Sequence, residues 1–184
     1  RHLRADRGIV AVAVQGQRLS QAPSDGAAAG GRPAIPCYVM DRVGRPPRRI
    51  DCLMPRILVL VAHPDLARSR VSRVLFDAAR ALATSDRTIE VDDLYARYPD
   101  YLIDSGAEQA RLQAADLLVW VHPIHWYGMP PLLKLWLDEV FAFGWAYGPG
   151  GAALRGRDLW LVTSTGGPED SYRHDGYNRY PFDA

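Results

Sequence analysis

From residue 56 onward, the spacing of hydrophobic and polar positions predicts regular structure. Residues 57–62 and 116–122 are continuous apolar runs, which is typical of parallel strands that are covered on both faces. Residues 88–92 alternate between apolar and polar, as an edge strand does, and 158–163 form a fourth strand-like run. The pattern therefore predicts four strands in this part of the chain.

Three segments between these strands, 69–82, 105–115 and 130–143, carry apolar residues at helical spacing. Ser105 and Glu108 form the pattern of a capping box, which predicts that the second helix starts at Ser105. Strands that alternate with helices imply right-handed crossovers and an α/β fold with a parallel sheet. In such sheets ligands bind beyond the carboxyl ends of the strands, so the loops that follow the strands form the candidate site.

The loop after the first strand predicts an anion site. Residues 63–69 lead into a helix N-terminus, where backbone N–H groups and the helix dipole favour an anion such as a phosphate. Ser69 and Ser72 add hydroxyl donors, and His63 or Arg70 adds a further donor. The loop has neither the glycine pattern of a dinucleotide fingerprint nor a Walker lysine. Simple capping of the helix by Ser69 is the alternative interpretation.

The loop at 123–129 is rich in aromatic and histidine side chains. Trp126 and Tyr127 are adjacent, and two aromatic side chains at a strand end are difficult to bury unless a flat ligand such as a flavin ring packs on them. A hydrophobic plug is one alternative. Metal binding by His122 and His125 is another, but no third ligand stands at a familiar spacing, and we expect no metal.

Two further segments are candidates for ligand contact. Thr165-Gly-Gly167 follows the fourth strand, and glycines there let the backbone approach a ligand closely. An ordinary turn is the alternative interpretation of that segment. Residues 141–147 are dense in aromatic side chains and fit either a dimer surface or lid, or core packing at the end of the third helix.

Charge and composition change at Met54. Residues 1–53 hold nine Arg, no Lys and four Asp, a net charge of +5, whereas residues 54–184 hold 13 basic and 17 acidic residues, a net charge of −4. The first segment is rich in Gly, Pro, Ala and Arg, so we expect a disordered basic extension rather than a polybasic binding arm. The folded domain is predicted to span 54–184. A total charge of +1 favours no nucleic-acid partner.

Cysteine usage and hydrophobicity fit a cytoplasmic protein. Cys37 and Cys52 suggest no disulfide framework, and residues 54–184 contain no cysteine, which fits a reducing compartment. No apolar run approaches the roughly 18 residues that a transmembrane helix needs.

In combination, four of these segments resemble a known family. His63-Pro64, the block from His122 to Lys134, Trp145-Ala-Tyr-Gly148 and Thr165-Gly-Gly167 are similar to segments of the flavodoxin-like NAD(P)H:quinone oxidoreductases. The resemblance covers about residues 55–184.

Three other segments narrow the resemblance. Residues 94–100, 169–172 and 177–181 resemble the ancillary subunits of glutathione-regulated potassium-efflux systems, the KefF/KefG type. This narrower resemblance implies a cytoplasmic protein that is peripheral on the cytoplasmic face of the inner membrane and activates a potassium-efflux antiporter.

The resemblance implies a flavodoxin-like, three-layer, doubly wound parallel sheet with strand order 2-1-3-4-5. The family continues through another helix, a fifth strand and a closing helix, whereas this sequence stops at Ala184. We therefore expect a C-terminally truncated fold with four of the five strands. The fourth strand would then be an open edge, and one sheet face would lack a helix. The apolar stretch Gly8–Val14 is the segment of this chain that could cover part of the gap.

The resemblance also implies a flavin site, with FMN preferred, FAD as the alternative, and NAD(P)H as the electron donor. The predicted cofactor-binding residues, phosphate side first, are His63, Ser69, Arg70, Val71 and Ser72, then Pro123, Ile124, His125, Trp126 and Tyr127, then Ser164, Thr165, Gly166, Gly167 and Tyr172.

Two residue sets are implied for the reaction. Trp126, Tyr127 and Tyr147 match aromatic residues that line the substrate slot of the family, with Tyr147 reaching across a homodimer. The predicted catalytic set is Tyr172, Tyr127 and His125, because Tyr172 falls where the family carries a tyrosine beside the flavin.

The position of a proton-relay histidine differs from the family. The family carries a histidine a few residues after the tyrosine that corresponds to Tyr172, and Asn178 stands there in this sequence. His174 is the nearest substitute.

The implied activity is ping-pong hydride transfer, in which NAD(P)H reduces flavin N5 and leaves, and a quinone then takes the hydride from the same face. A non-enzymatic, flavin-binding regulatory subunit of the potassium-efflux system is the competing interpretation. A flavodoxin-like electron carrier is the third. The adjacent aromatic residues of the second loop favour a substrate slot over a carrier.

Overall fold

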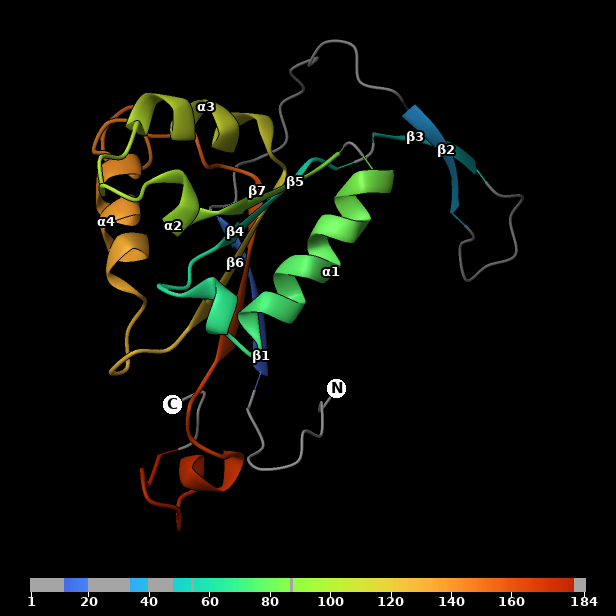
Figure 1. The fold of residues 1–184 in the computed structure, drawn as a ribbon. Coiled ribbons are helices and arrows are strands. Elements are labelled where there is room, and N and C mark those ends of the chain that lie inside the picture. Colours follow the sequence, from blue (N-terminus) through green and yellow to red (C-terminus); the bar gives the residue numbers. More distant parts are fainter. Residues whose placement is uncertain (1–11, 20–33, 40–47, 54, 87, 181–184) are drawn as a thin grey trace.

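A computed structural model describes residues 12–19, 34–39, 48–53, 55–86 and 88–180. Its centre is a five-stranded sheet of order β1-β7-β6-β4-β5 (Figure 1). Strands β5, β4, β6 and β7 are parallel, and β1 is antiparallel to β7. The strands of this sheet are β1 (Val12–Leu19), β4 (Ile57–Val61), β5 (Ile89–Asp93), β6 (Leu117–Pro123) and β7 (Arg157–Ser164).

Helices lie on both faces of the sheet. Three of them pack on one face and α1 on the other, which makes three layers (Figure 1). The helices are η1 (Leu66–Arg68), α1 (Ser72–Ser85), α2 (Leu94–Arg97), α3 (Ser105–Ala114), α4 (Pro131–Val140) and η2 (Glu169–Tyr172).

Alternate side chains of strand β4 contribute to two separate hydrophobic cores. Leu58 and Leu60 point into the core beneath α3 and α4, whereas Val59 and Val61 belong to a smaller core beneath α1. The prediction that this strand is covered on both faces is therefore confirmed. On α4, the residues Leu132, Leu133, Trp136 and Val140 are fully buried, and their spacing is that of one helical face.

The predicted α/β fold is confirmed. All four predicted strands and all three predicted helices form, with boundaries that differ by no more than three residues. The parallel sheet with helices on both faces is the flavodoxin-like, doubly wound arrangement with four parallel strands.

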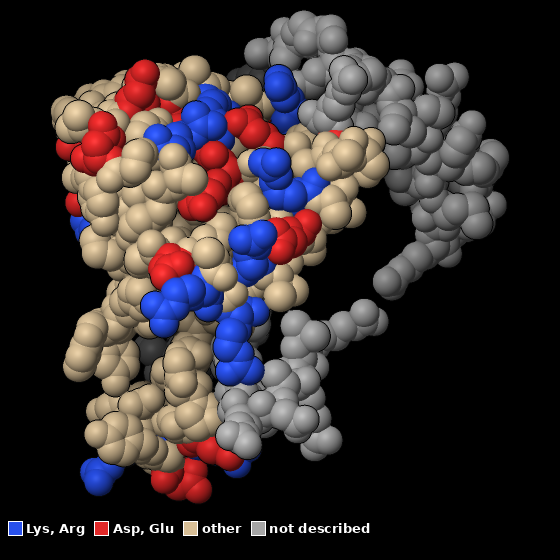
Figure 2. Space-filling model, in the orientation of Figure 1, with Lys and Arg blue, Asp and Glu red and all other residues tan. Residues whose placement is uncertain are grey.

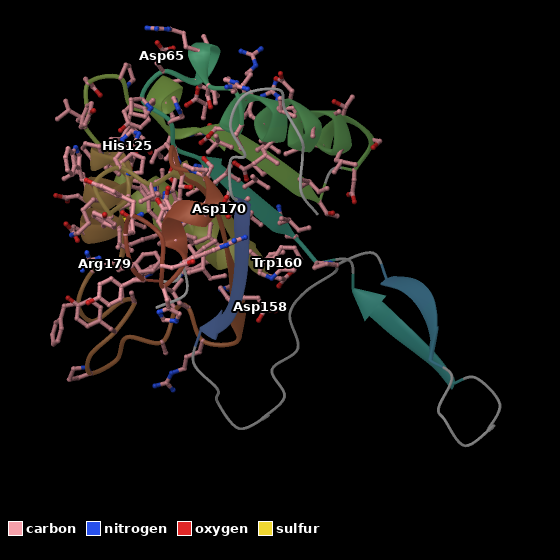
Figure 3. All side chains as sticks on the ribbon, turned by 90° about the horizontal axis from the view of Figure 1, so that it is seen from below. Asp65, His125, Asp158, Trp160, Asp170 and Arg179 are labelled. Carbon is pink, nitrogen blue, oxygen red and sulfur yellow. The ribbon has the colours of Figure 1, made fainter. Side chains whose placement is uncertain are left out.

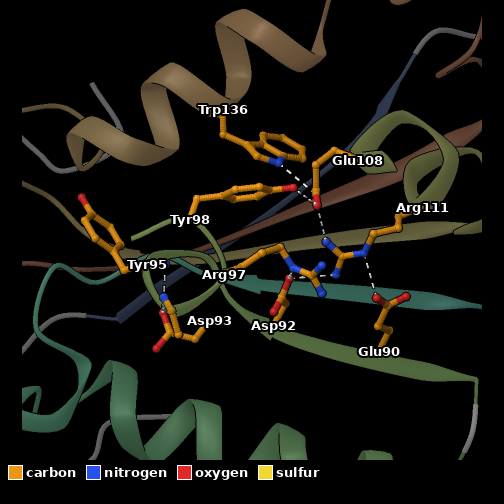
Figure 4. A network of polar contacts seen from close by, with 10 residues as sticks. Glu90, Asp92, Asp93, Tyr95, Arg97, Tyr98, Glu108, Arg111 and Trp136 are labelled. Carbon is orange, nitrogen blue, oxygen red and sulfur yellow. Dashed lines mark hydrogen bonds and ion pairs between the residues drawn. The ribbon is translucent and has the colours of Figure 1, made fainter. Parts of the chain in front are cut away.

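The capping-box prediction at Ser105 and Glu108 is wrong. The side chain of Asp104 caps α3 by accepting a hydrogen bond from the Ala107 N–H at 2.9 Å. Glu108 is fully buried and accepts hydrogen bonds from the Tyr98 hydroxyl and the Trp136 indole, both at 2.9 Å (Figure 4). A local pattern could not reveal this because Trp136 lies 28 residues away.

Three strands lie within residues 1–53, where we expected a disordered extension. Strand β1 pairs with β7 over eight residues, from Val12 opposite Ser164 to Leu19 opposite Arg157. Strands β2 (Ala34–Val39) and β3 (Arg48–Leu53) form a separate two-stranded sheet that stands apart from the main one (Figure 1). The structure describes these three segments as strands, and the expectation of disorder for the remainder of residues 1–53 lies outside the described residues. Within Gly8–Val14, Val12–Val14 pair with the edge of β7, and residues 8–11 fall outside the described part.

In the described part of the chain, no helix packs closely on the face of β7 that carries Trp160. Helix α1 packs against β4, β5 and β6, and Trp160 of β7 remains 46% exposed. The face of β7 that carries Trp160 is thus partly open in the described structure.

Within the described ranges, no helix combines the length and hydrophobicity that crossing a membrane requires.

Candidate functional site

The carboxyl ends of β4, β6 and β7 meet at one edge of the sheet, where the three predicted loops lie. The Ile124 N–H donates to the Ser164 carbonyl at 2.8 Å, which joins the second loop to the third. Figure 3 views the molecule from this side and shows Asp65, His125 and Asp170, one from each loop. The structure therefore brings together the segments that the sequence predicted as one site.

The first loop places a ring nitrogen and a hydroxyl near a helix start. His63 Nδ1 accepts a hydrogen bond from the Asp65 N–H at 3.1 Å, so a neutral His63 carries its proton on Nε2. Ser69 Oγ accepts from the Ser72 N–H at 3.0 Å, which leaves the Ser69 hydroxyl proton available to a ligand. Val71, the residue before α1, provides no side-chain cap.

The predicted phosphate-side residues differ in accessibility. Arg70 is exposed, His63, Ser69 and Val71 are half-buried, and Ser72 is only 2% exposed. Ser72 can therefore contribute through its backbone more readily than through its hydroxyl. Figure 2 shows basic side chains where Figure 1 places η1 and the start of α1, a charge distribution that favours an anion.

Titratable groups of neighbouring strand ends influence one another. Burial, and then the charge of His125, hold the pKa of His63 below its usual value, while Asp65 and Asp93 oppose this shift. Burial raises the pKa of the Asp93 carboxyl. Sequence analysis missed Asp93, which is the last residue of β5 and would have been found by extending the strand-end rule to the edge strand.

The second loop is a tight turn that displays two aromatic rings. His125 and Gly128 exchange two backbone hydrogen bonds, at 2.9 and 3.0 Å, and between them Trp126 and Tyr127 have φ angles of 49° and 62°. Left-handed backbone is unfavourable for bulky residues. Trp126 is nevertheless 96% exposed and Tyr127 79% exposed, so neither ring packs into the core. The hydrophobic-plug alternative is wrong.

The third loop combines a buried anchor with an open glycine. Thr165 is 4% exposed and its hydroxyl donates to the Gly167 carbonyl at 3.0 Å. A Cβ placed on Gly166 would have no atom within 4 Å, whereas one on Gly167 would meet the Tyr172 ring at 3.5 Å. Gly166 therefore has free space for a ligand, and Tyr172 packs back on the loop.

The segment after the third loop returns to the aromatic turn. The Tyr127 hydroxyl donates to Asn178 Oδ1 at 3.2 Å. Asn178, noted in the sequence only as a departure from the family, is thus a direct neighbour of a predicted site residue. Sequence spacing could not show this because the two residues are 51 positions apart.

Tyr147 is separate from the other two predicted slot residues. Helix α4 begins directly after the turn with Trp126 and Tyr127 and ends at Val140, before the loop that carries Tyr147. Ten helical residues span about 15 Å. Tyr147 instead lines a partly open cavity of about 440 Å³ together with Phe141 and Leu154.

Metal-ligating side chains do not converge in the described part of the chain, which holds no group of three His, Cys, Asp or Glu side chains arranged to bind an ion. His122, one of the two residues considered for a metal, is 6% exposed, and its Nδ1 lies 3.0 Å from the Pro123 carbonyl. Burial lowers the pKa of His122.

Comparison with known proteins assigns the family. The family model described as a flavodoxin-like fold matches residues 55–184. The chain belongs to this flavodoxin-like family.

Solved structures of similar fold carry different functional names. The general stress protein 14 of Treponema denticola, solved in complex with FMN, is 42% identical with a TM-score of 0.62, and the match covers 69% of this chain and 71% of that chain. A thermophilic tryptophan halogenase from Streptomycin violaceusniger is 41% identical with a TM-score of 0.61, covering 68% and 71%. An NADPH-quinone reductase from P. pentosaceus is 29% identical with a TM-score of 0.59, covering 70% of each chain. Because these names differ, the choice of activity depends on the chemistry of the site.

Proposed function

We propose that this flavodoxin-like protein is an FMN-dependent NAD(P)H:quinone oxidoreductase. The observation that carries the proposal is the turn at the carboxyl edge, where Trp126 and Tyr127 are held in left-handed backbone with their rings exposed. Strained, solvent-exposed aromatic side chains are unfavourable for stability and are typical of ligand sites. The FMN complex of the T. denticola protein and the quinone-reductase name of the P. pentosaceus protein support the same assignment.

The residues present fit the phosphate end of FMN. An anion at the start of α1 would meet backbone N–H groups of the first turn, the Ser69 hydroxyl and His63 Nε2–H. Exposed Arg70 adds positive charge. FMN is preferred over FAD because an FMN complex is found among the similar structures.

The residues also fit a flat ring system. The space beside Gly166 and the backbone of Pro123, Ile124 and Ser164–Gly167 would frame its polar edge, and the Trp126 and Tyr127 rings would pack against its faces or against a substrate stacked on it. The ring would then lie at the edge between β4, β6 and β7, where doubly wound sheets bind ligands.

The bound flavin supplies hydride acceptance from NAD(P)H and hydride donation to a quinone at its N5 atom. The chain orients the two substrates in turn and excludes water around the reacting atoms. Tyr172, half-buried against Gly167, and Tyr127 provide hydroxyl groups near the ring, and His125 provides an imidazole. We assign these three to the stabilisation of charge during transfer.

We further propose a homodimer in which Tyr147 completes the slot of the partner subunit. Within one chain, α4 separates Tyr147 from Trp126 and Tyr127, and Phe143 and Tyr147 are 69% and 58% exposed. Sedimentation analysis should give twice the chain mass, and Tyr147→Phe and Tyr147→Ala should alter the KM for quinone without altering FMN affinity.

The role as an ancillary, peripheral activator of a potassium-efflux antiporter rests on the sequence resemblance of residues 94–100, 169–172 and 177–181. If the protein serves instead as a non-enzymatic regulatory subunit, it should bind flavin and show no turnover. A steady-state NADH–quinone assay on flavin-loaded protein distinguishes these two functions.

The proposal is tested first by cofactor binding. Purified protein incubated with FMN and desalted should absorb near about 450 nm, as oxidised flavins do, with one FMN per chain. Trp126→Ala should lower flavin or quinone affinity while Trp160→Ala, which removes an exposed aromatic on the α1 face of β7, should not. Protein that retains no flavin under these conditions would refute the proposal.

A further inference from the structure

An exposed side-chain contact joins the second ligand loop to the segment that follows the third loop. The Tyr127 hydroxyl donates to Asn178 Oδ1 at 3.2 Å, and Tyr127 is 79% exposed. The contact therefore lies at the mouth of the site rather than in the core.

Backbone hydrogen bonds fix the Asn178 side of this contact. The Asn178 N–H donates to the Ser171 carbonyl at 2.9 Å, and the Ser171 N–H donates to the Pro168 carbonyl at 3.0 Å. Gly176 leaves no room for a side chain, because a Cβ there would stand 2.1 Å from the Asp170 carbonyl oxygen. Residues 168–180 are therefore a compact segment that presents Asn178 in a defined place.

The Tyr127 side is fixed as well. The two backbone hydrogen bonds between His125 and Gly128 close the turn, and the left-handed φ of Tyr127, 62°, sets the direction of its ring. A side-chain hydrogen bond thus joins two locally ordered segments. Losing it should let segment 168–180 open more often, because exposed segments open locally at a cost set by the contacts that hold them.

We propose that Asn178 is a positioning residue that latches segment 168–180 onto the aromatic turn through the Tyr127 hydroxyl and so limits the size of the substrate that enters the slot. The identity of that substrate, a quinone, rests on the proposed function, whereas the latch itself does not. An asparagine amide does not titrate, so this latch holds equally well in acidic and neutral solution.

The latch is tested directly by trypsin cleavage after Arg173 and Arg179, followed by mass spectrometry on the full chain. Arg173 is 61% exposed, so access depends on how often the segment opens. Loss of one neutral hydrogen bond should raise cleavage at these two sites about 2- to 10-fold. Tyr127→Phe and Asn178→Ala should give the same increase, and the double variant should give no more than either one.

Three controls make the result specific. Asn178→Asp keeps an acceptor for the Tyr127 hydroxyl and should restore slow cleavage. Tyr177→Phe removes a hydroxyl from a side chain that is 92% exposed, and should have no effect. Cleavage within α1, after Arg73 and Arg80, should be equal in all variants and reports that the domain remains folded.

Substrate size is tested on flavin-loaded protein with one-ring and three-ring quinones. Tyr127→Phe and Asn178→Ala should improve kcat/KM for the larger quinone relative to the smaller one by about 2- to 10-fold, mainly through KM. If the two substitutions had additive effects on trypsin cleavage, the proposed latch would be refuted, whatever the quinone-reductase activity. A confirmed latch in a protein that reduces no quinone would leave the latch standing and refute the proposed function.

Discussion

At the scale of single residues, the buried carboxylate of Glu108 accepts hydrogen bonds from three side chains. Besides Tyr98 and Trp136, it accepts a hydrogen bond from Arg111 Nη1 at 2.7 Å (Figure 4). Burial, and then the bond to Glu108, raise the pKa of Tyr98 to about 12, so the phenol remains a donor at all relevant pH values. Arg111 Nη2 lies 3.0 Å from Asp92 Oδ2 without hydrogen-bond geometry, a contact that is ionic.

Glu108→Gln should lower the free energy of unfolding by about 3 kcal/mol, since removing one partner of a buried charged network leaves the others uncompensated. The amide also turns one acceptor oxygen into a donor that faces other donors. Urea unfolding followed by circular dichroism measures the change. Glu139→Gln, on the exposed side of α4, is the matched control and should leave the midpoint unchanged; equal midpoints for both variants would contradict the prediction.

His122 should make the protein less stable in acid. Burial lowers its pKa in the folded state, so below about pH 6.5 the unfolded chain takes up a proton that the folded chain resists. The free energy of unfolding should then fall as the pH falls, by at most about 1.4 kcal/mol per pH unit for this group.

The measurement compares urea midpoints between neutral and mildly acidic solution. His122→Asn, which keeps a donor for the Pro123 carbonyl, should flatten the dependence, and a residual slope of the same sign should remain from His63, whose pKa is also lowered. A slope unaltered by His122→Asn would show that the buried imidazole is not responsible.

At the scale of elements, the turn from His125 to Gly128 has strained backbone, and we expect this strain to lower stability while displaying two aromatic rings to a ligand. Asn-Gly is the residue pair preferred in two-residue turns with left-handed backbone. Replacing Trp126 by Asn and Tyr127 by Gly should therefore raise the free energy of unfolding by about 1 kcal/mol net and weaken FMN or quinone binding.

The matched control replaces both residues with alanine, which removes the rings and keeps a Cβ at both left-handed positions. It should lose ligand affinity to a similar degree and gain no stability. If the Asn-Gly variant were no more stable than the Ala-Ala variant in urea, backbone strain at the turn would not be the cause.

Local periodicity predicted the elements that bury apolar side chains at regular intervals along the sequence. The apolar runs of β4 and β6 and the helical stripe of α4 depend on burial, which the sequence records residue by residue. Strand β1 was missed because its residues include Gln15, Gly16 and Gln17, and because its partner β7 lies more than 130 residues away. Pairing at such distances has no local signature.

The candidate site followed a similar rule. The three strand-end loops were predictable because a parallel sheet brings all carboxyl ends to one edge. Which side chains meet there was not, as Tyr127 and Asn178 show, because their contact depends on how two irregular segments fold back. Ser72 was predicted to offer its hydroxyl to a phosphate, but its side chain is buried. A favourable residue type does not reveal whether the side chain faces the ligand.

At the scale of the whole molecule, β1 occupies the sheet edge that the resemblance reserved for a fifth strand. An unpaired edge strand exposes a row of N–H and C=O groups that invites pairing with another chain. The eight-residue register between β1 and β7 removes that row, whereas the β2–β3 hairpin forms its own two-stranded sheet. The three ligand loops follow β4, β6 and β7, so we expect the ligand site to form without either of these additions.

A chain that begins at Met54 should therefore bind FMN as tightly as the full chain but associate more readily in a concentration-dependent way. Chains beginning at Val12 and at Ser20 separate the causes, because the first retains β1 and the second lacks it while both retain the hairpin. The Val12 chain should behave like the full chain, and the Ser20 chain like the Met54 chain, in light scattering and in FMN titration.

Loss of FMN binding in the Ser20 chain would mean that β1 supports the third loop, whose first residue, Ser164, lies opposite Val12 in the sheet. Equal association in all four chains would mean that the β7 edge is protected by something other than β1.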